Sequence, residues 1–234
     1  MKDESSTSAG RTQNARVAEI EIPAKIDSIN VAIVDDDQHF REALAFQLET
    51  AGFRVTAYGS AESFLESFRF EHYDCIVADV CLPGINGLQL LAEARQTVPF
   101  VSIVFVTGSG DISIGVQAMR EGAVDCLEKP IDDRALLNSI RRAIDLYRSK
   151  SAEALQRLEL RQREGTLTPR EHEVFGLITS GLLNKQVGAT LGTTERTIKT
   201  HRGRVMDKMC ADSLADLVRM ADILRIQPTF ALLR

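Results

Sequence analysis

The stretch Val31-Ala-Ile-Val-Asp-Asp-Asp37 decides how this chain is expected to fold. Its β-branched run is typical of a buried parallel strand, and its end places adjacent carboxylates at the C-terminal tip of that strand. Three more apolar runs follow at 75–80, 101–106 and 124–127, with Asp79, Thr107 and Lys129 at their ends. Strand tips converge at one edge of an open α/β sheet, so these residues are expected to form one site.

Strands and helices alternate from residue 29 to about residue 148. Helical patterns are expected at 38–51, 61–70, 87–96, 112–121 and 133–148, between strands at 31–34, 53–58, 75–78, 101–106 and 124–127. Five β/α units predict a doubly wound, flavodoxin-like sheet of five parallel strands with right-handed crossovers. Leu155 and Leu158 continue the apolar face of the last helix, so that helix is expected to run into the polar linker 149–165.

A second, all-helical domain is expected at 166–234, and it opens with a capping box. Thr168 would cap a helix that has proline at its first position and Glu171 reaching back. Gly181 predicts the end of that helix, and Asn184 is expected to cap the next. The pattern then continues as a short helix, a glycine turn, a basic helix and a last helix, at 185–191, 192–193, 194–209 and 213–224, which predicts a helix-turn-helix.

Charge is divided unevenly between the two halves. Residues 29–149 hold 18 Asp and Glu against 10 Lys and Arg, a net charge of −8, whereas residues 166–234 hold 7 against 10, a net charge of +3. This asymmetry indicates that only the second half contacts nucleic acid. Residues 1–28 are rich in Ser, Thr and charge, which predicts a disordered N-terminal extension.

The chain lacks the features of a membrane or secreted protein. Its apolar runs are shorter than the roughly 18 residues of a membrane span, and its start has no apolar signal segment. A cytoplasmic location without membrane contact is therefore expected. The cysteines have no CxxC spacing, so we expect buried free thiols rather than disulfides or a zinc site, at Cys75, Cys81, Cys126 and Cys210.

The residues at the strand tips indicate phosphoryl chemistry. An aspartate can accept a phosphoryl group as an acyl phosphate, so Asp79 is the expected phosphoacceptor. Lys129 would pair with the phosphate, and Thr107 would hydrogen-bond one of its oxygens. Magnesium prefers such oxygen ligands. The expected ligands of Mg²⁺ are Asp35, Asp36, Asp79 and the backbone carbonyl of Cys81. Each residue also has a plainer explanation: Asp37, for example, is expected to cap the helix 38–51.

Residues 29–148 resemble the receiver domain of two-component response regulators. The resemblance rests on Asp35-Asp36, Asp79-Val-Cys-Leu-Pro-Gly-Ile-Asn-Gly87, Val106-Thr107-Gly108 and Glu128-Lys129-Pro130. The spacings of 43, 28 and 22 from Asp36 through Asp79 and Thr107 to Lys129 are similar to those of the FixJ-type subgroup. The resemblance implies Mg²⁺-dependent phosphotransfer from a sensor histidine kinase to Asp79. Thr107 then shifts, and the surface formed by 112–121, the fifth strand and 133–148 repacks.

Two residues depart from the receiver pattern. Leu82 replaces the usual methionine, a swap that conserves volume. Cys126 stands where the family usually has Tyr, Phe or His, the ring that rotates inward when Thr107 moves. A cysteine is too small to play that part. We expect the phosphorylation chemistry to survive, while the substitution bears on how strongly the switch is coupled.

Residues 166–226 resemble the LuxR-type helix-turn-helix domain. The matching text is Leu167-Thr-Pro-Arg-Glu171, Gly181-Leu-Leu-Asn-Lys185 and Thr197-Ile-Lys-Thr-His201-Arg202. The resemblance implies base contacts by Lys199 and Thr200. Gly203 stands where the family often presents a larger side chain, so base readout at that position is either lost or supplied by Arg204. Candidate phosphate contacts are Asn184, Lys185, Arg202 and Lys208, and the DNA-binding set also includes Thr197 and His201. The alternative is that the basic residues of this helix only form a solvated face. The spacing of Ile198, Val205 and Met209 argues against this alternative, because these three residues can bury one face of the helix while the basic residues face outward.

The two resemblances predict a phosphorylation-dependent transcription regulator of the FixJ/NarL class and not an enzyme. Phosphorylation at Asp79 would promote a homodimer that binds double-stranded promoter DNA, with RNA polymerase as a further partner. One alternative is a DNA-binding regulator that works without phosphorylation, which Cys126 keeps open. Another is a Mg²⁺-dependent aspartyl-phosphate phosphatase. That enzyme usually needs a second carboxylate soon after the nucleophile, whereas residues 80–83 are Val, Cys, Leu and Pro.

Overall fold

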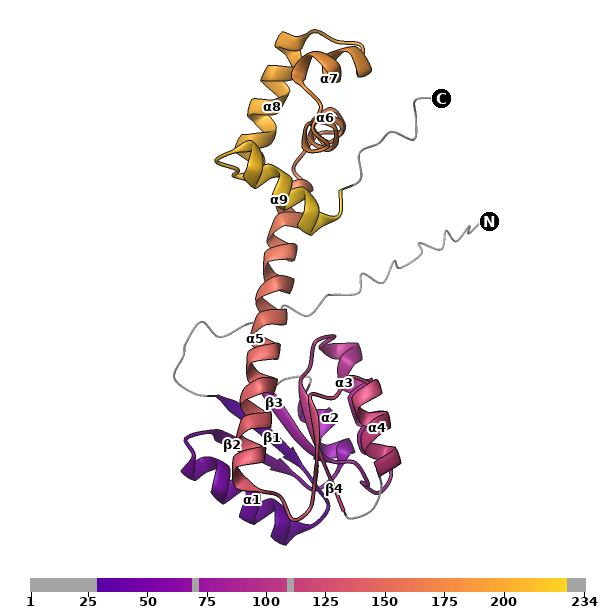
Figure 1. Ribbon diagram of the computed structural model, residues 1–234, viewed down its shortest axis with the longest axis vertical. Helices are drawn as coiled ribbons and strands as arrows, with labels where there is room; N and C mark the ends of the chain where they lie inside the picture. The colour runs from indigo at the N-terminus through magenta and orange to yellow at the C-terminus, as the bar shows by residue number, and fades with distance from the viewer. Residues whose placement is uncertain (1–28, 69–71, 109–111, 227–234) are drawn as a thin grey trace, which may run out of the picture.

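Parallel strands form the centre of the N-terminal part, in the order β2-β1-β3-β4-β5 (Figure 1). This computed structural model describes residues 29–68, 72–108 and 112–226, so the expectation for residues 1–28 lies outside the described residues. The strands are β1 (Asn30–Val34), β2 (Arg54–Tyr58), β3 (Cys75–Asp79), β4 (Ile103–Thr107) and β5 (Asp125–Glu128). The helices between and after them are α1 (Gln38–Thr50), α2 (Ala61–Phe68), α3 (Gly87–Thr97), α4 (Ile112–Arg120) and α5 (Asp133–Glu164). The doubly wound fold is confirmed.

Burial on both faces of the sheet explains why the central strands are continuous apolar runs. Every residue of β3 and β4 is buried. One face packs on a cluster that includes Phe64, Leu90 and Phe105, and the other on a cluster that includes Leu48 and Leu136. The register pairs Val34 with Ala78, Asp79 with Val106, and Thr107 with Glu128. The C-terminal tips of β1, β3, β4 and β5 therefore end together at one edge.

Strand limits differ from the expected ones by one or two residues, because pairing rather than apolar character ends a strand. Val101 is buried, but the paired register of β4 begins at Ile103. At β5 the paired register runs from Asp125 to Glu128, so it excludes Val124. Neither change moves a residue of the expected site away from its strand tip.

The helix α5 is the longest element, with 32 residues in one uninterrupted run. At a rise of about 1.5 Å per residue it spans roughly 48 Å. It leaves the sheet domain and ends beside the second domain (Figure 1). The expected extension into the linker is confirmed. However, Leu155 and Leu158 are 42% and 55% exposed, so the described residues do not bury that apolar face.

The second domain contains α6 (Pro169–Thr179), α7 (Asn184–Thr190), α8 (Glu195–Met209) and α9 (Leu214–Leu224). The Thr168–Glu171 capping box is present, and α6 ends before Gly181, whose φ is +93°. The expected cap at Asn184 is wrong, because Asn184 is already the first helical residue of α7. There the Gln186 side chain accepts the Leu183 N–H. Within the described residues, no helix is both long and apolar enough to cross a membrane.

Candidate functional site

Three carboxylates from two strand tips meet at the C-terminal edge of the sheet. Asp35 and Asp36 follow β1, and Asp79 ends β3. One oxygen from each lies within 4.8 Å of the others. Asp35 is 1% exposed and Asp79 8%, whereas Asp36 faces solvent. Such an all-oxygen set suits a hard divalent cation that keeps part of its water shell.

Lys129 links the two buried carboxylates. Its Nζ donates to Asp35 Oδ2 and to Asp79 Oδ2, each at 2.7 Å. The other oxygens accept backbone N–H groups, Asp79 Oδ1 from Cys81 at 2.7 Å and Asp35 Oδ1 from Asp37 at 2.9 Å. Lys129 also lies 4.0 Å from the centroid of the Phe40 ring. The ammonium is thus held directly over the carboxylate of Asp79.

Burial and pairing shift the proton affinities of this group. Burial raises the pKa of Asp35, although hydrogen bonds from Lys129 and from the Asp37 amide oppose the shift. Burial would lower the pKa of Lys129, but the hydrogen bonds to Asp35 and Asp79 outweigh it, and the pKa lies above its usual range. Lys129 is therefore a fixed positive charge. A second cation or an anion that binds in this pocket would therefore replace some of the hydrogen bonds that Lys129 makes to the two carboxylates.

The loop after Asp79 is held by residues that sequence reasoning missed. Gly87 opens α3, and a Cβ there would lie 2.6 Å from the carbonyl oxygen of Asp79 and 2.8 Å from the Phe105 ring. Glu62 of α2 accepts the Ile85 N–H at 3.0 Å, which lowers the pKa of Glu62. Glu62 lies 23 residues from Ile85, so local patterns could not reveal the pairing.

Thr107 and Cys126 lie on neighbouring strands behind the carboxylates. Thr107 is 8% exposed, and its hydroxyl donates to the Gly108 carbonyl at 3.3 Å. Cys126 is half-buried in β5, packed against α4, where its Sγ would lie 3.6 Å from a Cβ at Gly115. Burial raises the pKa of the Cys126 thiol. None of the four cysteines forms a disulfide, but the expectation that they are buried is correct only for Cys75, because Cys126 is half-buried and Cys81 and Cys210 are exposed.

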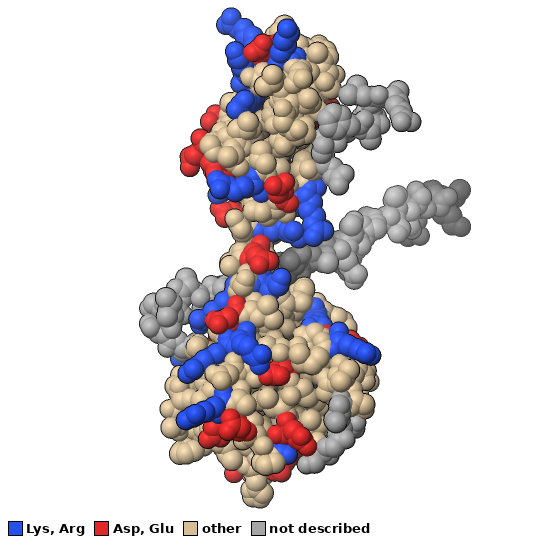
Figure 2. All heavy atoms as spheres, in the orientation of Figure 1, with Lys and Arg blue, Asp and Glu red and all other residues tan. Residues whose placement is uncertain are grey.

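The helix α8 divides its residues between a buried face and an outward face. Ile198, Val205 and Met209 are fully buried, as their spacing predicts. Thr194 caps the helix and bonds the N–H of Thr197 at 3.2 Å. The expected DNA-binding set divides by exposure. Its exposed members are Lys185, Thr197, Lys199, Thr200 and Arg204, and its half-buried members are Asn184, His201, Arg202 and Lys208. Lys and Arg gather at the outer end of this domain (Figure 2).

Lys208 differs from the other basic residues of α8. Its Nζ lies 2.6 Å from Glu171 Oε2 and 2.9 Å from the Thr166 carbonyl oxygen. Glu171 is 2% exposed, and the hydrogen bond from Lys208 lowers the pKa of Glu171 to about 2. This pair joins the start of α6 to the end of α8. The structure therefore gives Lys208 an internal partner, while its side chain stays 33% exposed.

Two polar atoms near α8 lack internal partners. Asn184 Oδ1 and His201 Nδ1 are buried and accept or donate no hydrogen bond within the described part of the chain. Thr200, in contrast, donates to the Arg196 carbonyl at 3.2 Å. Unpaired buried polar atoms are uncommon, since each one costs free energy.

Each of the two parts of the chain matches a known protein family. Residues 31–141 match the family described as response regulator receiver domain, and residues 165–221 match bacterial regulatory proteins of the luxR family. A receiver domain implies a histidine kinase as phosphodonor, and a LuxR-type domain implies DNA binding. The chain belongs to the FixJ/NarL class of response regulators and is a phosphorylation-dependent transcriptional regulator.

Similar proteins and solved structures align with most of the chain. The transcriptional regulatory protein FixJ of Azorhizobium caulinodans is 39% identical over 86% of this chain and 96% of that protein. Nodulation protein W of Bradyrhizobium diazoefficiens is 42% identical over 84% and 86%. Among solved structures, the response regulator StyR has a TM-score of 0.72 and 37% identity, over 83% of this chain and 98% of that one. Full-length FixJ from B. japonicum has a TM-score of 0.52 and 36% identity, over 84% and 97%.

Proposed function

We propose that Asp79 is the phosphoacceptor of this regulator. The carrying observation is that Lys129 lies 2.7 Å from the carboxylate of Asp79, next to Asp35. A carboxylate oxygen of Asp79 would form the bond to phosphorus as the P–N bond of a kinase phosphohistidine breaks. Lys129 would move from Asp79 to the transferred phosphoryl group, and the Thr107 hydroxyl would leave the Gly108 carbonyl to hydrogen-bond a phosphoryl oxygen.

We propose that Mg²⁺ is the cation of this site, held by Asp35, Asp36, Asp79 and the backbone carbonyl of Cys81. The three carboxylates supply hard oxygen donors, and the exposed Asp36 leaves room for water ligands. When bound, Mg²⁺ would neutralise charge on the phosphoryl oxygens. Asp35 would hold its position through the Asp37 amide while it gives up its bond to Lys129.

A shallow groove beside Lys129 supports contact with a kinase. Phe40, Ala43 and Gln47 of α1 line one side, and Pro130 and Ile131 line the other. The groove has a largely apolar lining and adjoins the ammonium that contacts Asp79. We propose that the sensor histidine kinase packs here and thereby brings its phosphohistidine to Asp79. In this role the chain receives a phosphoryl group and is not itself an enzyme.

We propose that the phosphorylated receiver forms a homodimer and that two copies of α8 then bind promoter DNA in the cytoplasm. Val116 and Met119 of α4 are each 47% exposed, and β5, which contacts α4, carries Asp125 in an ion pair with Arg142 of α5. Lys199 and Thr200 would contact bases, with Arg204 as a further reader. Asn184, Lys185, Arg202 and Lys208 would contact phosphates, and Thr197 and His201 would complete the interface. RNA polymerase is a further proposed partner.

The phosphoacceptor is tested by mass spectrometry of the intact chain after incubation with acetyl phosphate. We expect one added phosphoryl group that requires Mg²⁺ and is absent from Asp79→Asn. Asp37→Asn is the matched control, because it makes the same charge change beside the site and asparagine still caps α1. Equal phosphorylation of the Asp79→Asn variant would overturn the assignment.

A further inference from the structure

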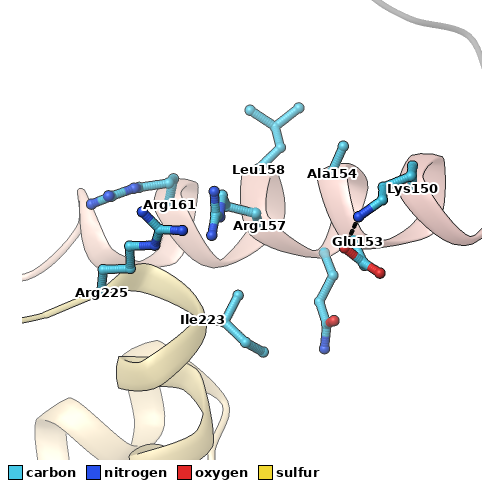
Figure 3. Close-up of a pocket in the computed structure, with 9 residues that line it drawn as sticks. Lys150, Glu153, Ala154, Arg157, Leu158, Arg161, Ile223 and Arg225 are labelled. Carbon is cyan, nitrogen blue, oxygen red and sulfur yellow. Dashed lines mark ion pairs between the residues drawn. The ribbon is translucent and has the colours of Figure 1, made fainter. Parts of the chain in front are cut away.

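A groove lies between the C-terminal half of α5 and the end of α9 (Figure 3), and its lining includes no residue of the phosphoacceptor site. Its volume of about 760 Å³ falls within the range of roughly 300–1,000 Å³ typical of ligand pockets. Ala154 and Leu158 of α5 and Ile223 of α9 supply apolar surface. The otherwise polar linker therefore carries apolar side chains on the wall of a groove, where burial against another segment would be favourable.

The charge of this groove is unbalanced. Arg157, Arg161 and Arg225 gather at one end (Figure 3). Arg161 pairs with Glu164 at 2.8 Å and donates to the Leu224 carbonyl. The side chains of Arg157 and Arg225, in contrast, have no hydrogen-bond or ion-pair partner among the described residues, and the acid of the groove, Glu153, faces Lys150 at 3.8 Å. Clustered cations of this kind favour an acidic occupant.

The chain itself contains a segment of matching chemistry within residues 1–28. Residues 17–22 are Val-Ala-Glu-Ile-Glu-Ile. In an extended conformation alternate side chains point to opposite sides, so Ala18, Ile20 and Ile22 would share one side, and Glu19 and Glu21 the other. The first side matches the apolar wall, and the second matches the unpaired arginines.

This segment can reach the groove. Asn30 donates its backbone N–H to Asp74, the residue whose carboxylate lies 3.9 Å from Arg148 of α5. The chain before β1 therefore leaves from beside α5. Arg157 lies nine residues, or about 14 Å, further along the helix. Ile29 lies eight residue steps beyond Glu21, and an extended chain of eight steps spans up to about 28 Å.

We propose that residues 17–22 bind in this groove as an intramolecular latch, with Glu19 and Glu21 on Arg157 and Arg225. The latch would connect the base of the receiver domain to α9 and so restrain the linker between the two domains. Residues 227–234 follow Arg225 of the groove closely in sequence and include Phe230, Leu232 and Leu233, but their one charged side chain is Arg234, which the arginines would repel. A second copy of the chain is the remaining rival occupant.

The test is photo-crosslinking of the full chain with a benzophenone amino acid at position 20, mapped by mass spectrometry. We expect crosslinks to 150–161 and 223–225 within one chain. Glu19→Lys with Glu21→Lys should lower their yield about tenfold, as expected for two opposed ion pairs. Asp3→Lys with Glu4→Lys, the same charge change outside the segment, should leave it intact. Adding Arg157→Glu and Arg225→Glu to the first pair should restore it.

Other outcomes overturn the latch. These are crosslinks that persist after charge reversal, crosslinks between isotopically distinct copies, or crosslinks to the groove from a benzophenone at position 232 and not at position 20. Arg157 and Arg225 have no internal partners among the described residues, so their substitution should leave the fold intact. The measurement uses neither phosphodonor nor DNA, so its result is independent of the phosphoacceptor proposal.

Discussion

The strand-tip pocket and the outer face of α8 hold charged residues in opposite ways. In the pocket, side chains from three separate segments bond one another, as Lys129 does with Asp35 and Asp79. On α8 the charged side chains come from a single helix and face solvent; Lys199 is 65% exposed, and its neighbour Glu195 lies 3.3 Å away. The pocket is therefore internally compensated, whereas α8 is ready for an external anion.

Because of this difference, substitutions at the two sites should affect stability and function in different ways. A buried charge costs free energy even when it is paired, so the charged residues that give the pocket its function lower the stability of the folded protein. An exposed lysine contributes little to stability, because solvent screens it. Substitutions of the exposed, outward residues of α8 should change DNA binding alone, while substitutions in the pocket should change function and stability together, and with opposite signs.

The largest effect is expected for Lys199→Ala. Loss of a base contact should cost roughly 1–3 kcal/mol of discrimination, enough to abolish specific binding at physiological salt. The free energy of unfolding should stay within about 0.5 kcal/mol of wild type. Footprinting on an operator obtained by in vitro selection provides the measurement. Lys185→Ala is the control, since a lost phosphate contact weakens binding to all sequences alike. An unchanged footprint for Lys199→Ala would sink the recognition-helix assignment.

In the pocket, Asp35→Asn should slow phosphorylation by acetyl phosphate roughly 100-fold, because one carboxylate ligand of the cation is lost. The unfolding free energy should rise by about 1 kcal/mol, since burial disfavours the charged carboxylate and raises the pKa of Asp35. Urea unfolding and rate measurements on the same sample test both. A variant that loses stability while keeping its phosphorylation rate would reverse the contrast between the sites.

The Glu171–Lys208 pair sharpens the contrast, because it is a compensated ion pair inside the DNA-binding domain. Glu171→Gln should lower stability by roughly 2 kcal/mol. The folded pKa of about 2 lies below the ordinary 4.5, so the pair stabilises above pH 4.5, and its contribution is lost as pH falls toward 2. Hydrogen exchange of α6 and α8 amides in the full chain measures it. Glu173→Gln, in an exposed pair with Arg170, should change stability by less than about 0.5 kcal/mol. An equal effect of both variants would remove the distinction.

The smallest effect is expected for Cys126→Ser. Burial raises the pKa of this thiol, so it stays protonated and poorly reactive. The phosphorylation rate should remain within about twofold of wild type, because replacing a thiol by a hydroxyl at a half-buried position has only a small effect. Cys81→Ser, at the exposed cysteine beside Asp79, provides the comparison. A large loss from either substitution would indicate thiol chemistry in the pocket.

The convergence of the pocket was predictable because parallel strands end together at one edge. The position directly after or at the end of an apolar run was enough to assign four residues to the pocket: Asp35, Asp79, Thr107 and Lys129. The buried stripe of α8 followed from helical spacing in the same way, and the Thr168 capping box lies within four residues.

Contacts between distant segments were not predictable. Lys208 lies 37 residues from Glu171, so nothing local distinguished it from the outward basic residues of α8. Phe40 over Lys129 and Glu62 on the loop after Asp79 depend on how helices pack against strand tips. The misassigned cap at Asn184 came from residue preference, whereas Gln186 satisfied the backbone instead. The exposed Cys81 shows that a position beside a strand does not guarantee burial.

The central claim is that charge at Asp79 controls α8 through association of two copies. The most direct measurement is sedimentation and DNA binding of the full chain with and without acetyl phosphate and Mg²⁺, beside Asp79→Asn. The account predicts a dimer and tighter specific binding that require both the donor and Asp79. Equal association and equal DNA affinity of wild type and Asp79→Asn under all conditions would contradict it.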